Sequence, residues 1–258
     1  MSGKRRMLRT VTATRYVTPL REGGSLPAII EADDQGLYVL KFHGAGQGPK
    51  ALAAELIAAQ LAAALQLPIP ETVFAELDPA LGRNEPDAEI RDLLLRSPGQ
   101  NLAMDYLPGS LMFDPAAKHT VDPELASRIV WFDAFITNID RTPRNPNLLR
   151  WHKQLYLIDH GAALYFHHDW PQDLTRTAQA RFPAIKQHVL LPWATELAAA
   201  NQWAKAALTE AHFTGAVAQV PTDWLAAKAE QYADYFTERL AHSDGFTEEA
   251  ERAHADLL

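Results

Sequence analysis

The sequence predicts an α+β protein with two lobes, a small lobe of mainly antiparallel sheet followed by a mainly helical lobe. Short strand-like segments and one long helix come first, and helical periodicity takes over after the segment 104–110. With 258 residues, of which 47% are hydrophobic, the chain can bury a substantial core, either as one bilobal domain or as two small ones. We therefore expect a sheet lobe at residues 1–104, a hinge at 105–110 and a helical lobe at 111–258.

Three short strands are expected at residues 16–20, 28–32 and 36–42. The turn between the first two contains Gly23, Gly24 and Ser25. Glycines allow backbone amides to close on phosphate oxygens, so this turn is a candidate nucleotide-covering loop, although most such turns are only turns. A second glycine cluster at residues 43–50 is either a flexible connection or part of a nucleotide pocket.

A lysine, Lys41, lies near the end of the third strand. Burying an ammonium group is costly unless an anion is near, so Lys41 needs a phosphate or carboxylate partner, unless it points outward from an edge strand. Pro49 and Pro68 bracket a helix expected at residues 50–67. Glu55 lies in this helix on a stripe of small alanine side chains, which predicts that it pairs with Lys41.

The polar segment 78–100 is expected to be an insertion between two strands, with one helical patch near residues 88–95. The strand after it runs from residue 101 into a turn at Pro108 and Gly109. Further helices are expected at residues 184–200, 202–211, 223–241 and 247–257. The tryptophans of the helical lobe are expected to be core residues.

The most informative pattern is the spacing of Asp140, Asn145 and Asp159. A polar loop carries the first two, between the apolar segments 129–136 and 155–158, and Asp159 begins an Asp-x-Gly sequence. Phosphoryl-transfer enzymes use this spacing for one catalytic carboxylate and two magnesium ligands. The Asp-x4-Asn pair alone occurs often by chance, but a polar loop held between core elements suits a ligand site.

Composition excludes several other classes of function. The net charge of -8 argues against non-specific nucleic-acid binding, and the absence of cysteine excludes disulfides and thiolate metal sites. Adjacent histidines at 167 and 168 point to opposite sides of an extended segment and do not indicate zinc. The apolar stretch 51–69 is interrupted by polar residues, so no membrane span is expected, and with nothing resembling a signal peptide a cytoplasmic protein is expected.

Taken in order, a glycine-rich turn, a strand lysine, a helix glutamate, a hinge, an Asp-x4-Asn loop and an Asp-x-Gly sequence resemble a kinase. The chain is similar to HipA-like kinases and their phosphatidylinositol-kinase-like relatives, which use Asp-Arg-x-x-x-Asn and a variable Asp-x-Gly, over roughly residues 10–240. The resemblance implies a bilobal protein-kinase-like fold, with ATP and Mg²⁺ as cofactors. It makes Lys41 the phosphate-binding lysine, Glu55 its ion-pair partner, Asp140 the catalytic carboxylate, and Asn145 and Asp159 the magnesium ligands.

The same resemblance implies two further roles. Kinases contact adenine through the segment that joins their lobes, which here contains Met104, Asp105 and Tyr106. Arg141 follows the catalytic Asp directly, and either stabilises charge on the transferring phosphoryl group or pairs with a nearby carboxylate.

The chain departs from the protein-kinase pattern in having no Gly-x-Gly-x-x-Gly, His-Arg-Asp, Asp-Phe-Gly or Ala-Pro-Glu sequence. Only about a dozen residues precede the first predicted strand, too few for the extra N-terminal subdomain of HipA toxins, which leaves an antitoxin partner open. Three functions remain: a kinase whose hydroxyl acceptor is Ser or Thr of a protein, a kinase of a small molecule such as a lipid headgroup or sugar, and a non-catalytic nucleotide-binding module. The sequence does not identify the acceptor.

Overall fold

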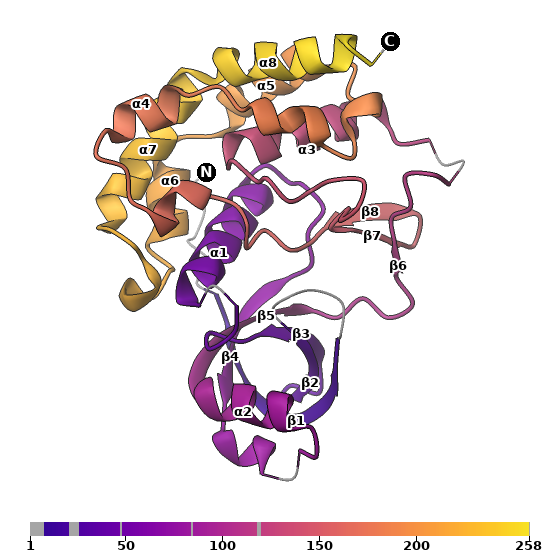
Figure 1. Ribbon diagram of the computed structural model, residues 1–258, viewed down its shortest axis with the longest axis vertical. Helices are drawn as coiled ribbons and strands as arrows, with labels where there is room; N and C mark the ends of the chain where they lie inside the picture. Colours follow the sequence, from indigo (N-terminus) through magenta and orange to yellow (C-terminus); the bar gives the residue numbers. More distant parts are fainter. Residues whose placement is uncertain (1–7, 21–25, 47, 84, 118–119, 258) are drawn as a thin grey trace.

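Five strands of the N-terminal lobe close into a barrel in the order β1–β2–β3–β5–β4, as the computed structural model shows (Figure 1). The structure describes residues 8–20, 26–46, 48–83, 85–117 and 120–257. Neighbouring strands are antiparallel, except that β1 and β4 are parallel. The expected mainly antiparallel sheet is confirmed, whereas its closure was not predicted. The strands are β1 (Thr10–Pro19), β2 (Ala28–Ala32), β3 (Leu37–Lys41), β4 (Thr72–Leu77) and β5 (Gly99–Asp105).

The barrel has its own apolar core, made by alternating inward-facing residues of the strands such as Ile30, Leu40 and Val73. Helix α2 (Ala88–Arg96) lies within the segment between β4 and β5, as expected, after a 3₁₀ turn at Pro79–Gly82. Its buried side chains Ile90, Leu93 and Leu94 join the barrel core.

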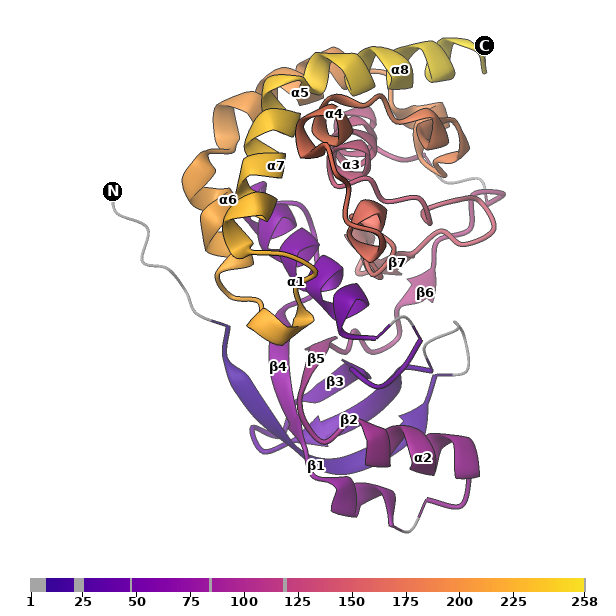
Figure 2. The ribbon, with the colours of Figure 1, turned by 60° about the vertical axis from the view of Figure 1, so that its left-hand side comes forward.

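Helix α1 (Pro49–Ala64) leaves the barrel and runs into the helical lobe (Figures 1 and 2). It begins with proline at its first turn, where a missing amide costs nothing, and most of its residues are buried. Those buried residues, among them Leu56, Ile57 and Leu61, belong to the same core cluster as Phe132 of the helical lobe. Although α1 lies within the range expected for the sheet lobe, its packing joins it to the helical lobe.

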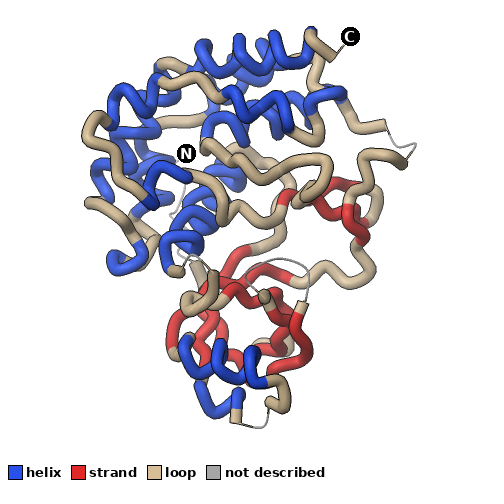
Figure 3. The backbone as a smooth tube through the Cα atoms, in the orientation of Figure 1, coloured by secondary structure: helices blue, strands red, loops and turns tan. Residues whose placement is uncertain are grey.

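Among its described residues, the helical lobe contains six further α-helices and a small sheet in the order β6–β7–β8, and Figure 3 shows these helices gathered above the barrel. The helices are α3 (Pro123–Phe135), α4 (Leu174–Gln179), α5 (Leu197–Ala207), α6 (Glu210–Val217), α7 (Ala229–Ala241) and α8 (Ser243–Ala255). The strands are β6 (Leu111–Met112), β7 (Leu148–Trp151) and β8 (Gln154–Leu157). No helix of the described residues is long and apolar enough to cross a membrane.

Several predicted helix boundaries in this lobe are wrong. Residues 184–200 form two 3₁₀ turns, Pro183–Gln187 and Leu191–Trp193, before α5 begins. Pro192 lacks an amide hydrogen, and the His188 ring accepts the amide of Leu190, so the local hydrogen bonds of a continuous helix are not made. The predicted helix 202–211 is divided at Thr209, which caps α6, and the predicted helix 223–241 begins only at Ala229.

The aromatic core of the helical lobe is as expected. Trp224 is buried, and Trp170, Trp193 and Trp203 pack against the core while partly exposed. Trp193 meets Phe113 edge to face, with ring centroids 6.0 Å apart. None of the four residues lines the cavity described below.

Candidate active site

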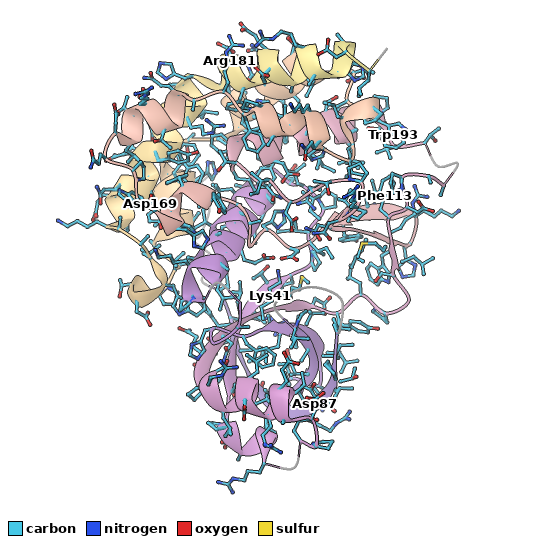
Figure 4. All side chains as sticks on the ribbon, in the orientation of Figure 1. Lys41, Asp87, Phe113, Asp169, Arg181 and Trp193 are labelled. Atoms are coloured by element: carbon cyan, nitrogen blue, oxygen red, sulfur yellow. The ribbon has the colours of Figure 1, made fainter. Side chains whose placement is uncertain are left out.

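Lys41 lies at the border between the barrel and the helical lobe (Figure 4). Its Nζ donates to Oε2 of Glu55 at 2.8 Å and to Oδ1 of Asp159 at 2.7 Å. Strand β3, helix α1 and the segment after β8 each supply one of the three residues. The expected pair of Lys41 and Glu55 is therefore present, and the Asp-x-Gly aspartate joins it.

The three charges differ in exposure. The side chains of Lys41 and Glu55 are 11% and 8% exposed, whereas that of Asp159 is 45% exposed. Burial opposes charge on Glu55, but the ammonium of Lys41 and the side chain of His160 outweigh it and lower the pKa of Glu55 to about 2. Burial also opposes charge on Lys41, and the carboxylates of Glu55 and Asp159 outweigh it, so the pKa of Lys41 is raised. Both members of the pair are charged near neutral pH.

Asp159 is presented by an unusual backbone conformation. Its φ is 55°, in the left-handed region that aspartate tolerates better than most residues. The next amide, from His160, donates to Oε2 of Glu55 at 2.6 Å, which fixes the segment to α1. Gly161 faces Ala51 of α1, and a Cβ atom at Gly161 would lie 3.7 Å from Cβ of Ala51, which is an ordinary packing distance.

The polar loop after α3 places Asp140 among side-chain amides. Its Oδ2 accepts hydrogen bonds from Nδ2 of Asn145 at 2.8 Å and of Asn147 at 3.4 Å. Its own amide donates to Oδ1 of Asn138 at 3.2 Å. The expected pair of Asp140 and Asn145 is thus in contact, and Asn138 and Asn147 are neighbours that the spacing argument did not single out.

Arg141 does not reach the cavity. Its side chain is fully buried, and the guanidinium donates to Asp133 and to the main-chain oxygens of Asn147 and Ile158. The geometry favours the alternative in which Arg141 pairs with a nearby carboxylate. Its assignment to the catalytic group is therefore revised, because all its donors are directed into the core.

A cavity of about 310 Å³ lies beside these residues. Lys41, Glu55, Asp140 and Asp159 line it, together with Gly161 and residues of the second glycine cluster. Gly48 of that cluster has a φ of 74° at the residue before α1, a conformation that favours glycine. The position of this glycine cluster supports a role as part of the pocket, rather than as a flexible connection alone. Ala45, Gly46, Gly48 and Ala51 form this wall of the cavity.

The other predicted nucleotide contacts differ in position. Gly23, Gly24 and Ser25 lie outside the described residues. Met104 lines a narrow cavity of about 10 Å³ that also contacts Lys41 and Glu55. The amides of Asp105 and Tyr106 donate to main-chain oxygens of Glu71 and Leu37, so those two donors are already used within the barrel.

The oxygens at this site suit a hard cation. Oδ1 of Asn145 and Oδ2 of Asp159 accept no hydrogen bond from the described residues. Mg²⁺ prefers carboxylate and amide oxygens, and it usually completes its shell with water and substrate phosphates. No three His, Cys, Asp or Glu side chains in the described part of the chain gather in a way that could hold a metal by themselves. The donor types fit a metal bound together with a phosphate: Asp159 lines the cavity, and Asn145, which does not line it, binds the lining residue Asp140.

Comparison with known proteins agrees with the fold. A family model for HipA-like kinases matches residues 14–244. The crystal structure of the Helicobacter pylori proinflammatory kinase CtkA is similar over 96% of this chain and 99% of that chain, with 13% identity and a TM-score of 0.53. The Golgi casein kinase, crystallised with Mn and ADP bound, is similar over 93% of this chain and 74% of that chain, with 12% identity and a TM-score of 0.54.

A search of curated proteins finds no match. At identities this low, the two structures show the fold alone, and the role of each residue in this chain depends on its own geometry.

Proposed function

The chain belongs to the HipA-like kinase family, and from that premise we propose that it transfers the γ-phosphoryl group of ATP, with Mg²⁺, to a hydroxyl group of a protein Ser or Thr. The observation that carries the proposal is the bridging position of Lys41. Its Nζ binds Glu55 and Asp159 at the same time, and all three line one cavity with Asp140. Phosphoryl transfer needs this combination of a cation for phosphate oxygens, a metal carboxylate and an acceptor carboxylate.

Each residue of the site has a task for which its geometry is suited. The ammonium of Lys41 is held in place by Glu55 and can neutralise phosphate oxygens without being drawn away into solvent. Asn145 and Asp159 would hold Mg²⁺, which supplies charge neutralisation for the phosphates. The Golgi casein kinase binds Mn and ADP, which supports nucleotide and divalent metal use in this fold.

Asp140 is proposed to orient the acceptor. Its Oδ2 is held by two asparagine amides, and Oδ1 accepts no hydrogen bond from the described residues. A fixed carboxylate with one oxygen available can accept the hydrogen bond of an attacking hydroxyl. Because the amides fix its orientation before the acceptor arrives, little reorganisation is needed at the moment of transfer.

The proposal is tested by incubating the protein with labelled ATP and Mg²⁺, with and without a cell lysate, followed by mass spectrometry. Label on Ser or Thr of a protein is expected. Label found only on a metabolite would replace the protein acceptor by a small molecule. The absence of label under all conditions would contradict phosphoryl transfer and leave nucleotide binding as the function.

A further inference from the structure

A further carboxylate, that of Asp133, is buried behind the catalytic loop and does not line the cavity. It lies in the third turn of α3, and its side chain is 0% exposed. Its Oδ1 accepts Nδ2 of Asn138 at 2.9 Å, and its Oδ2 accepts Nε of Arg141 at 2.5 Å and Nε2 of His188 at 2.9 Å. Both oxygens are therefore occupied by donors from the loop after α3 and from a segment far along the chain.

One of these donors leads directly to Asp140. The Asn138 side chain binds both residues. Its Nδ2 donates to Asp133, and its Oδ1 accepts the main-chain amide of Asp140 at 3.2 Å. The main-chain amide of Asn138 also donates to the main-chain carbonyl of Asp133 at 2.8 Å, which holds a tight turn at this point. The position of the Asp140 backbone is thus set from a fixed point inside α3.

The second donor leads to both halves of the site. Nη1 of Arg141 donates to the carbonyl of Asn147, whose side chain binds Asp140, and to the carbonyl of Ile158 at 3.2 Å. Ile158 directly precedes Asp159. A single guanidinium therefore ties the loop that carries Asp140 to the segment that carries Asp159.

The third donor holds the arrangement from outside the loop. Nδ1 of His188 accepts the amide of Leu190 at 3.0 Å, so Nε2 carries the hydrogen that it donates to Asp133. The amide of Val189 donates to the carbonyl of Arg141 at 3.0 Å. Burial opposes charge on Asp133, but Arg141 and His188 outweigh it and hold the pKa of Asp133 well below its usual range.

We propose that Asp133 is a positioning residue, which fixes the catalytic-loop carboxylate Asp140 and the metal-side carboxylate Asp159 relative to each other through Asn138 and Arg141. Its effect on turnover rests on the proposed kinase function. Its effect on loop order does not, because these hydrogen bonds join residues of this chain to one another. The alternative is that Asp133 only neutralises a buried arginine, which would make its contribution one of stability alone.

Two variants separate these roles. Asp133→Asn leaves the charge of Arg141 buried without a counter-ion, so the melting temperature is expected to fall by roughly 10 °C. Asp133→Asn combined with Arg141→Gln removes both charges and is expected to regain most of that loss. If Asp133 positions the site, turnover of the double variant stays about a hundredfold below that of the wild type, because misplacement of catalytic groups by about 1 Å costs that much.

A third variant isolates the route to Asp140. Asn138→Ala keeps the pair of Asp133 and Arg141 and removes both hydrogen bonds of the Asn138 side chain, the one to Asp133 and the one from the Asp140 amide. It is expected to lower kcat while the KM for ATP stays nearly unchanged, whereas the double variant also raises this KM, because the tie to Ile158 is lost. Asn201→Ala is the matched control, since Asn201 is buried and binds Trp131 of the same helix without touching the loop.

Amide hydrogen exchange on the full chain gives a readout that does not need activity. We expect roughly tenfold faster exchange in residues 138–147 for both Asn138→Ala and the double variant, and in residues 158–161 for the double variant, with no change there in Asn201→Ala. Unchanged exchange in those segments, or turnover that recovers together with the melting temperature in the double variant, overturns the proposal. A wild-type protein that transfers no phosphoryl group contradicts the proposed function only, since the exchange result still decides whether Asp133 positions the loops.

Discussion

At the scale of single residues, the carboxylate of Asp140 is held in a fixed orientation by the side-chain amides of Asn145 and Asn147. Asp140→Asn removes the charge that orients an acceptor hydroxyl and keeps an oxygen that can accept from Asn145. Turnover is expected to fall about a hundredfold or more, with melting temperature and ATP affinity nearly unchanged. Parallel measurements of turnover and melting temperature check this. Wild-type turnover in Asp140→Asn would mean that Asp140 only satisfies loop amides.

Asp159 and Asp140 are expected to differ in their effect on nucleotide binding. Asp159 has a half-exposed carboxylate that binds Lys41 with one oxygen and leaves the other available, whereas the side-chain contacts of Asp140 lie within its own loop. Asp159→Ala is therefore expected to weaken Mg²⁺-dependent ATP binding roughly tenfold or more, and Asp140→Ala much less. Calorimetry with and without Mg²⁺ measures both variants. Equal losses would show that the two roles are wrongly divided.

At the scale of elements, the first turn of α1 forms a wall of the cavity. Ala51 lines the cavity next to Gly161, so Ala51→Leu is expected to fill space that the nucleotide needs and to weaken ATP binding roughly tenfold. Ala63→Leu is the control, because Ala63 lies in the same helix but faces solvent. Both variants should melt within a few degrees of the wild type. Equal ATP affinity of Ala51→Leu and the wild type would place the nucleotide away from α1.

Elements with a local cause were predictable from the sequence, and those with a distant cause were not. Lys41 and Glu55 could be brought together because a charged residue in an apolar strand and one on an apolar helix need each other, whereas the contact of Asp159 with Lys41 was not predicted. The 3₁₀ turns at residues 183–193 could not be predicted, because the His188 side chain that shapes them is hydrogen-bonded to Asp133, 55 residues away. Arg141 is buried by contacts with Asp133, Asn147 and Ile158, and the sequence left its pairing with a carboxylate as one of two alternatives. Closure of the barrel depends on parallel pairing of β1 and β4, which no local pattern reveals.

At the scale of the whole molecule, buried histidines link stability to pH. Burial, with Lys50 and His168 nearby, lowers the pKa of His167 to about 3 from an ordinary value of 6.5, and its Nδ1 lies 3.2 Å from the Tyr232 hydroxyl. The unfolded chain therefore binds a proton between these values while the folded chain does not, so stability is complete above pH 6.5 and is lost as the pH falls. From pH 6.5 to 4.5, His167 is expected to contribute up to about 1.4 kcal/mol per pH unit.

His167→Gln tests this contribution. Denaturant unfolding at several pH values should give a shallower fall in the free energy of unfolding for the variant over that interval. His188, whose pKa burial also lowers, remains in the variant and accounts for part of the remaining slope. An identical slope in both proteins would show that the pKa of His167 does not differ between the folded and unfolded chain.

The packing of α1 decides how the two lobes can move. Because α1 shares a core cluster with the helical lobe and Glu55 binds the His160 amide, we expect Glu55 and Asp159 to move together, and Lys41 to move with the barrel strands. A hinge opening between the lobes would pull the lysine from both carboxylates together, so intermediate states with only one contact are disfavoured. A nucleotide that bridges the lobes would then hold them closed, and its apparent affinity would depend directly on the fraction of molecules in the closed state.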